Sequence, residues 1–260
     1  MWLSPSNQLV TTRSGYQSKM VWSRPNGPPK VWNTVEIVKS DGETIQFTIE
    51  EIPVDRYDEV VEHMCSIFIQ DEAMCSSMNV IDDPTSLELL RAFWKKIVAE
   101  GITIAAFVKS ENEKPIIAGI NVLSVSDKDS DKEIKPILSS MSKAEKIITF
   151  AINSSTEANP CERYGVDAYL GAVGLSVDPR YRRLGLGQRL LEARHKIGEA
   201  YGIAVTSTLF TSSASQATAA KAGYKVHMER LYDEIIDEKG DVVFPNLKGK
   251  IYKMMEKKLF

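Results

Sequence analysis

The chain has 260 residues, of which 43% are hydrophobic and 26% charged, so it can bury a core and is not a disordered or fibrous protein. Thirty-two basic residues against 35 acidic ones give a formal charge of −3, which argues against a general binder of nucleic acid or of a membrane surface. No apolar run approaches the ~20 residues that span a bilayer, and residues 1–30 lack the pattern of a secretory signal.

The sequence predicts a flexible arm over residues 1–30, which are rich in Ser, Gly, Pro and Asn, and a folded domain over residues 31–260. Two β-prone runs at 31–38 and 44–49 flank the turn signal Asp41-Gly42, which is typical of a β-hairpin. The domain should therefore begin with a hairpin.

Two helices are expected next. Apolar residues at spacings of three and four predict a helix over 55–70. Pro84 precedes the second helix, Thr85 and Glu88 have the spacing of a capping box, and Gly101 stands where a left-handed cap would end it. We expect this helix to start at Thr85.

The remaining elements alternate along the chain. Helices between mostly sequential strands, with no internal repeat, predict one α/β (α+β) domain with a mixed sheet. In chain order we expect strands at 102–108 and 115–125 paired antiparallel across the turn 110–113, a charged loop at 127–135, a helix at 142–153, a strand at 170–177, a helix at 184–200, a strand at 203–209, a helix at 213–222, and strands at 224–236 and 248–259.

The cysteines and histidines predict no metal site. Cys65, Cys75 and Cys161 lack C-x-x-C spacing, which argues against zinc and against a disulfide framework and favours a reducing cytoplasm. Cys65 is expected to be a small buried hydrophobic residue. His63 and His227 have no partner at a recognisable spacing and are expected to be surface or half-buried residues.

One segment has the pattern of an anion-binding loop. The strand at 170–177 leads into a stretch with four arginines within ten residues, and Gly185 and Gly187 then open a helix. The first turn of a helix has unpaired amides and a partial positive charge, and glycine lets a phosphate approach the backbone. We predict that the amides of residues 183–188, with nearby guanidinium groups, bind a diphosphate; an exposed basic helix start is the alternative.

The spacing excludes two common phosphate loops. Leu190 stands where Gly-x-Gly-x-x-Gly requires glycine, and no Gly-Lys-Ser/Thr follows. The remaining pattern, Arg182-x-x-Gly185-x-Gly187, resembles the acyl-coenzyme A pyrophosphate loop of the GNAT superfamily of N-acetyltransferases. The resemblance implies a single GNAT-type domain with a central, mixed, mostly antiparallel, splayed sheet flanked by helices. It implies that acyl-CoA contacts Leu175, Val177, Arg182, Arg183, Leu184, Gly185, Leu186, Gly187 and Gln188.

Within the superfamily the chain, over roughly residues 45–258, is most similar to the insect arylalkylamine N-acyltransferases. The run Phe68-Ile-Gln-Asp-Glu72 is similar to their Phe-x-x-Asp-Glu-Pro, and residues 211–224 are similar to their two serines four apart before Leu-Gly-Phe. The resemblance implies that Glu72 is the catalytic base, that Thr211 holds the first serine position and that Ser215 is the second serine. Two departures are Ala73 in place of proline and Ala219 in place of a tyrosine that donates a proton in many GNAT enzymes.

Acyl transfer to an amine has three chemical requirements. An alkylamine with a pKa near the ~10.4 of lysine must lose a proton before it attacks, and Glu72 could accept that proton directly or through water. Amides at a strand break over 174–177, ended by Pro179, could bind the oxyanion. Hydroxyls of Thr211 and Ser215 could stabilise the thiolate, although residues 211–215 are equally typical of a helix N-cap and an acidic pair at a helix end is commonly just exposed.

The expected function is direct transfer of an acetyl group from acetyl-CoA to a small primary amine in a ternary complex, without an acyl-enzyme or a metal. The resemblance implies arylalkylamines such as dopamine, serotonin, octopamine or tyramine. We expect a cytoplasmic monomer or weak dimer that binds neither nucleic acid nor membrane. The alternatives are another amine, a polyamine or a protein N-terminus, selected by loops 76–84 and 127–142, and a CoA-binding protein without turnover, which Ala73 and Ala219 motivate.

Overall fold

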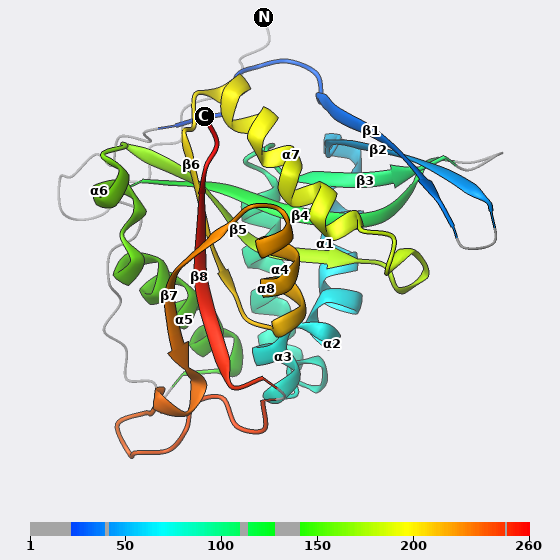
Figure 1. Ribbon diagram of the computed structural model, residues 1–260. Coiled ribbons are helices and arrows are strands. Elements are labelled where there is room, and N and C mark those ends of the chain that lie inside the picture. Colours follow the sequence, from blue (N-terminus) through cyan, green and yellow to red (C-terminus); the bar gives the residue numbers. More distant parts are fainter. Residues whose placement is uncertain (1–21, 40–41, 110–113, 128–140, 248) are drawn as a thin grey trace, which may run out of the picture.

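A twisted sheet forms the centre of the molecule in a computed structural model, which describes residues 22–39, 42–109, 114–127, 141–247 and 249–260 (Figure 1). In these ranges eight strands lie in the order β1-β2-β3-β4-β5-β6-β8-β7. Every neighbouring pair is antiparallel except β5 and β6, which are parallel. The strands are β1 Val31–Val38, β2 Thr44–Glu51, β3 Ile104–Val108, β4 Ile116–Asp127, β5 Ala168–Val177, β6 Val205–Phe210, β7 Lys225–Leu231 and β8 Ile251–Lys258.

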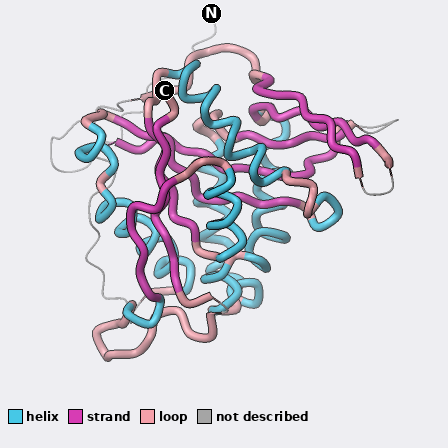
Figure 2. The backbone as a smooth tube through the Cα atoms, viewed as in Figure 1, coloured by secondary structure: helices cyan, strands magenta, loops and turns pink. Residues whose placement is uncertain are grey.

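The helices cover both faces of the sheet (Figure 2). A π-helical segment, Met64–Phe68, interrupts the helix predicted over 55–70, and the short helices α3 and α6 were not predicted. The fold is the predicted one: a single mixed α/β domain with a mostly antiparallel sheet flanked by helices. The helices are α1 Tyr57–His63, α2 Ile69–Asp71, α3 Ala73–Ser77, α4 Pro84–Val98, α5 Lys143–Ala158, α6 Pro160–Tyr164, α7 Leu186–Tyr201 and α8 Ser213–Lys221.

The predicted hairpin and the antiparallel pair β3–β4 are confirmed. Their turn residues Ser40, Asp41 and 110–113 lie outside the described residues, as does most of the loop 127–135. The start of α4 was predicted wrongly: Asp83 is the N-cap, and its carboxylate accepts hydrogen bonds from the amide and hydroxyl of Ser86, at 3.3 and 2.9 Å. Pro84 is the first residue of the helix, where its missing N–H costs nothing.

Strand β5 separates the two halves of the core. A Cβ on Gly174 would lie 2.3 Å from Met64, in the layer of α1, whereas one on Gly119 of β4 would lie 3.3 Å from Leu190 of α7. One buried cluster therefore packs the sheet against α1, α4 and α5, and a second packs it against α7. In Figure 1, α7 and α8 accordingly lie in front of the sheet and α1 and α4 behind it.

The sheet splays in its middle. Strands β5 and β6 pair only at Leu170 and Thr206, and beyond this point they diverge. The edge of β5 from residue 171 onward is left without a neighbouring strand on this side. Because parallel pairing stops so early, a space opens between the two strands, and it continues to the N-terminus of α7.

Candidate active site

The space between β5 and β6 is a cleft of about 1640 Å³. Both strands, the first turn of α7, the start of α8 and the junction of α2 and α3 line it. Leu184 is not among the lining residues, because its side chain packs against the core under α7. The cleft brings together the other predicted residues: Glu72, Leu175, Val177, Arg182, Arg183, Gly185, Leu186, Gly187, Gln188, Thr211 and Ser215.

The start of α7 has the features of an anion site. Its N-cap is Gly185, with a φ of 74°, and no side chain caps the first-turn amides. A Cβ at Gly185 would meet no atom within 4 Å, so the backbone is open at this point. Arg183 also has a positive φ, 62°, which residues other than glycine rarely adopt. This conformation helps turn the chain into the helix. Gly185, Leu186, Gly187 and Gln188 line the cleft, and no side chain among the described residues caps the first turn of the helix.

Three of the four arginines in this segment form ion pairs. Arg180 pairs with Asp178, and Arg189 with Glu192. Arg182 reaches across the cleft to Asp71 and donates from Nε to the carbonyl of Val177 at 3.0 Å. Ion pairs this exposed contribute only about 0–1 kcal/mol, so an incoming anion can displace the carboxylate.

Glu72 is held at the cleft by two hydrogen bonds. It ends α2 and is the N-cap of α3, where its Oε2 accepts from the amide of Cys75 at 2.7 Å. Its Oε1 accepts from the hydroxyl of Thr211 at 2.7 Å. The family pattern placed Glu72 and Thr211 139 positions apart in the same site, and the fold brings them into direct contact.

The hydroxyl of Ser215 takes part in the capping box of α8. Its Oγ accepts from the amide of Ser212 at 3.3 Å and donates to the carbonyl of Ser212 at 2.9 Å, while Ser212 caps the amide of Ser215. The N-cap interpretation of 211–215 is thus realised at Ser212 and Ser215. Ser215 nevertheless lines the cleft, so its hydroxyl remains within reach of it.

The open edge of β5 supplies hydrogen-bonding groups to the cleft. Antiparallel strands exchange bonds at alternate residues, so every second amide over 174–177 points away from β4. The register between β4 and β5 shifts beside Val173, whose carbonyl accepts from the indole of Trp94 at 3.2 Å. Asn121 donates to the carbonyl of Gly174 at 2.9 Å. These two bonds hold the open edge of β5 in place.

Arg194 is a cleft residue that sequence reasoning missed. Its fully buried guanidinium donates to the side chains of Asn121, Thr206 and Thr208 at 2.8–2.9 Å. Its Nη2 has no hydrogen-bond partner among the described residues, and burial lowers the pKa of Arg194. The signal was present in the sequence: Arg194 stands four residues after Leu190 on the apolar stripe of α7, where a charge is unexpected.

His63 is also misjudged from the sequence. It is buried, and its Nε2 lies 2.9 Å from the hydroxyl of Ser176 on β5, whereas His227 is exposed as expected. Burial lowers the pKa of His63 from 6.5 to about 4, and the positive charge of Arg182 contributes in the same direction. His63 therefore stays neutral near pH 7 and positions the strand edge that carries Ser176.

This lowered pKa predicts a loss of stability in acid. As the pH falls from 6.5 to 4, the unfolded chain protonates His63 while the folded chain does not, so the free energy of unfolding falls. The full difference corresponds to about 3 kcal/mol, and below pH 4 His63 adds nothing further. We expect urea unfolding of His63→Gln to show a weaker pH dependence in this window; parallel curves for variant and wild type would contradict the assignment.

The known proteins that this chain is similar to are found among solved structures. No protein-family model and no curated protein matches the sequence. The chain is similar to a structure assigned as arylalkylamine N-acetyltransferase 7 of the yellow fever mosquito Aedes aegypti, with 27% identity, a TM-score of 0.82, and coverage of 92% of this chain and 100% of the other.

Two further solved structures share the fold. Arylalkylamine N-acetyltransferase 2 of Aedes aegypti is 23% identical, with a TM-score of 0.70. The polyamine N-acetyltransferase of Drosophila melanogaster is 19% identical, with a TM-score of 0.71. Each alignment covers 82% of this chain and 99% of the other.

The splayed sheet, the uncapped start of α7 and the likeness to the structure of arylalkylamine N-acetyltransferase 7 define an acyl-CoA-dependent N-acetyltransferase with the GNAT fold. Within that class, the chain has the fold of the insect arylalkylamine N-acetyltransferases, which confirms the resemblance seen in the sequence. In the described ranges, no three His, Cys, Asp or Glu residues are grouped to hold a metal, and no helix has the length and apolarity needed to cross a membrane.

Proposed function

We propose that this protein transfers an acetyl group from acetyl-CoA to the primary amine of a small arylalkylamine by direct attack in a ternary complex. The observation that carries the proposal is that one cleft has both the uncapped amides of α7 and the fixed carboxylate of Glu72 in its walls. The amides of α7 can bind the diphosphate of CoA, and the carboxylate of Glu72 can accept a proton from an ammonium ion. The cytoplasmic location and the monomeric or weakly dimeric state remain predictions from the sequence.

Each step of the reaction has a residue suited to it. Glu72 takes a proton from the ammonium ion, and the neutral nitrogen attacks the thioester carbon. Amides on the open edge of β5, over 174–177, stabilise the oxyanion that forms. The carbon–sulfur bond then breaks, the amide forms, and the nitrogen loses its second proton while the thiolate gains one. The Ser215 hydroxyl and the buried cation of Arg194 are the groups of the cleft wall suited to stabilise that thiolate.

The lining of the cleft supports an aromatic amine. Phe68 and Trp94 contact each other edge to face with ring centroids 5.8 Å apart, and Phe93 and Tyr169 line the same space. Aromatic rings prefer such offset or edge contacts, so an aryl group can join this cluster. The similar Drosophila protein is a polyamine N-acetyltransferase, and the carboxylate of Glu100 also lines the cleft, so a polyamine is the second candidate.

Two measurements test the proposal. Free CoA should raise the melting temperature, because a ligand that binds only the folded state stabilises it by about 2.7 kcal/mol at 100 times its Kd. A panel of phenethylamine, tyramine, spermidine and an N-terminal peptide with acetyl-CoA should release thiol with the arylalkylamines. Greater release with spermidine would favour the polyamine. A CoA-induced shift without thiol release from any amine would indicate a CoA-binding protein without turnover.

A further inference from the structure

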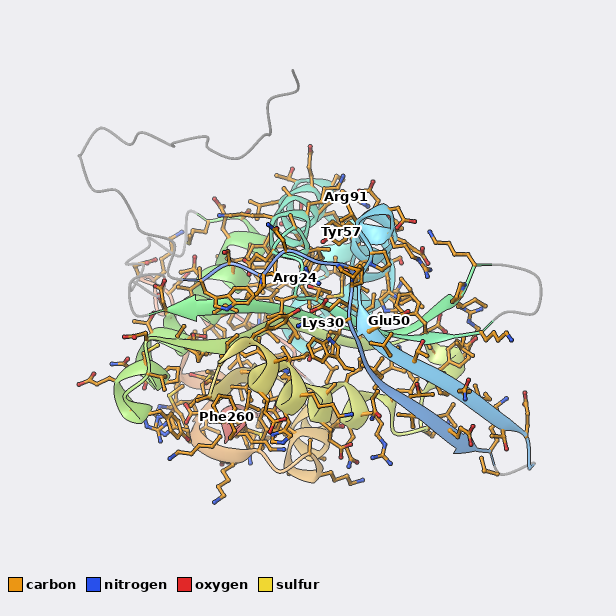
Figure 3. The ribbon with its side chains drawn as sticks, turned by 90° about the horizontal axis from the view of Figure 1, so that it is seen from above. Arg24, Lys30, Glu50, Tyr57, Arg91 and Phe260 are labelled. Atoms are coloured by element: carbon orange, nitrogen blue, oxygen red, sulfur yellow. The ribbon has the colours of Figure 1, made fainter. Side chains whose placement is uncertain are left out.

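Residues 22–30, here called the strap, run across one end of the domain before β1 begins. Figure 3 shows this segment from above, with Arg24 and Lys30 on it and Tyr57 of α1 nearby. Residues 22–30 belong to the arm predicted as flexible, yet Trp22, Ser23 and Arg24 line the active-site cleft. This part of the chain is therefore a wall of the site as well as a connection to the first strand.

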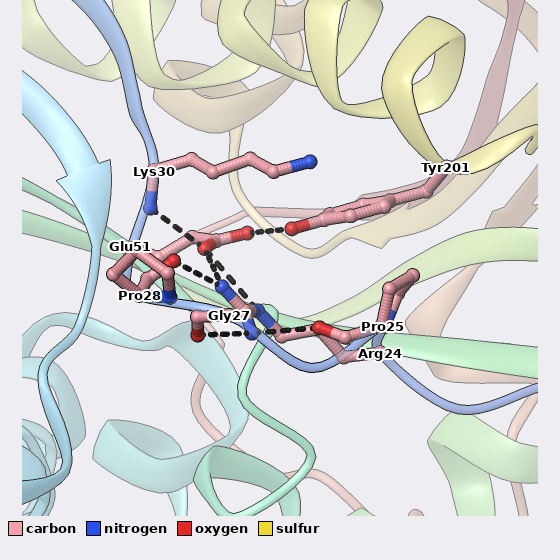
Figure 4. Close-up of polar contacts among 7 residues, drawn as sticks. All are labelled: Arg24, Pro25, Gly27, Pro28, Lys30, Glu51 and Tyr201. Atoms are coloured by element: carbon pink, nitrogen blue, oxygen red, sulfur yellow. Dashed lines mark hydrogen bonds and ion pairs between the residues drawn. The ribbon is translucent and has the colours of Figure 1, made fainter.

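A buried carboxylate anchors the strap. Glu51 at the end of β2 is 1% exposed and accepts hydrogen bonds from Arg24 Nε at 3.2 Å, Arg24 Nη2 at 2.6 Å, the amide of Lys30 at 2.9 Å and the hydroxyl of Tyr201 at 2.5 Å. Figure 4 shows these groups converging on Glu51. Because a buried charge is tolerated only when it is fully paired, Glu51 requires the strap to stay in place.

The guanidinium of Arg24 also fixes the path of the strap. Its Nη1 donates to the carbonyls of Pro25 and Gly27, at 3.0 and 3.1 Å, and its Nη2 donates to Pro28 at 2.8 Å. One side chain thus closes the Pro- and Gly-rich loop around itself while it holds Glu51. Arg24 therefore links the strap to Glu51 and to the carbonyls of its own loop.

Aromatic contacts hold the strap from the side of α7. The ring of Tyr201 lies edge-on to Trp22 and Trp32, with centroids 5.8 and 5.6 Å apart, and the ammonium group of Lys30 lies 4.3 Å from its ring centre. Edge-to-face contacts between aromatic rings stabilise a structure beyond the burial of their surface. The indole of Trp22 therefore has a defined place at the cleft wall.

The strap lies at the opposite end of the cleft from the predicted diphosphate loop. A Cβ on Gly101 would lie 3.1 Å from the side chain of Arg24, and the adjacent Glu100 accepts from the amide of Val125 at 3.4 Å. Val125 pairs with Leu170. From Leu170 to Val177, where the loop begins, β5 extends about 23 Å at ~3.3 Å per residue. The strap therefore lies away from the diphosphate loop and from Glu72, whose neighbour Asp71 pairs with Arg182. Only the distal part of an amine extended along the cleft would reach it.

We propose that Trp22 and Arg24 close the amine end of the cleft and limit the length of the amines that the enzyme accepts. This proposal rests on the proposed acetyltransferase function. A short arylalkylamine would end before the indole of Trp22, whereas the distal group of a longer one would collide with it. Glu51 has the role of a positioning residue, because it acts on the amine only by holding the strap.

A series of ω-phenylalkylamines with two to six methylene groups tests the length limit. In the wild type, kcat/KM should fall steeply beyond the length that reaches Trp22. In Trp22→Ala the fall should move to longer chains, with the ratio of long to short amines rising about tenfold, while the Kd for CoA stays unchanged. An unchanged length profile, or a Kd for CoA that rises as much as the KM for amines, would overturn the proposal.

Hydrogen exchange of the strap provides a readout that does not depend on turnover. Glu51→Gln should speed exchange over residues 22–30 and relax the length profile, whereas Glu43→Gln, which alters an exposed ion pair with Lys39 in the same hairpin, should do neither. In the wild type, amines but not CoA should slow exchange there. Slowed exchange without acetylation of any amine would overturn the catalytic proposal alone. Acetylation without slowed exchange would overturn the role of the strap alone.

Discussion

Replacing Glu72 by Gln is expected to lower kcat by about 10²- to 10⁴-fold, the usual contribution of a positioned general base. The substitution keeps the shape of the side chain. Its amide oxygen can still accept from the amide of Cys75, and its amide nitrogen can donate to the hydroxyl of Thr211. The start of α3 is therefore preserved, and the loss is confined to the proton acceptor.

The pH profile separates this role from a structural one. Without a base, the rate depends on the fraction of amine that is already neutral, so activity in Glu72→Gln should keep rising with pH toward the pKa of the amine. Glu88→Gln, which changes an exposed carboxylate of α4 that does not line the cleft, is the matched control and should leave kcat unaltered. If Glu72→Gln keeps the wild-type pH profile, Glu72 is not the base.

Local signals in the sequence were sufficient for most of the fold. Hydrophobic spacing and turn residues located the eight strands of the described residues, although β7 ends at Leu231 rather than at 236. The Gly-rich loop after a strand located the start of α7. The boundary of α4 was missed because Asp83, Pro84 and Thr85 are all compatible with a helix start. Only the geometry shows that the carboxylate of Asp83 reaches the amide of Ser86.

The errors at the site concern residues whose environment is set by distant segments. His63 has no nearby partner in the sequence, yet Ser176, 113 residues later, lies within hydrogen-bond distance. Asp71 pairs with Arg182 across 111 residues. Burial of His63 follows from the packing of the adjacent π-helical segment, Met64–Phe68, against β5, which no local pattern encodes. The predicted residues of the family motif, apart from Leu184, line one cleft, because the motif carries tertiary information that periodicity lacks.

The strap is a further segment whose environment is set by distant residues. Its Pro, Gly and Asn content gives a low tendency to form helix or strand, and it forms neither in the described residues 22–30. Order comes instead from the buried carboxylate of Glu51, which is contributed by another element. Composition carries no signal of anchoring by contacts with distant residues.

Arg182→Glu is expected to raise the KM for acetyl-CoA by at least about tenfold. Hydrogen bonds to charged groups contribute about 1.5–3 kcal/mol, which corresponds to about 10- to 150-fold in affinity, and the new carboxylate adds repulsion against a diphosphate. Increasing salt should reduce this rise in the KM, since Arg182 is 40% exposed and ions screen its charge.

Arg189→Glu is the matched control for this charge reversal. Arg189 belongs to the same basic segment, but it pairs with Glu192 on α7 and does not line the cleft. Its reversal changes the net charge equally, so a general field effect would raise the KM in both variants. A site-specific contact would raise it only in Arg182→Glu. Because Arg182 is bound to Asp71, Asp71→Asn should lower the KM by freeing the guanidinium for the diphosphate. An unchanged KM in Arg182→Glu would remove Arg182 from the acyl-CoA site.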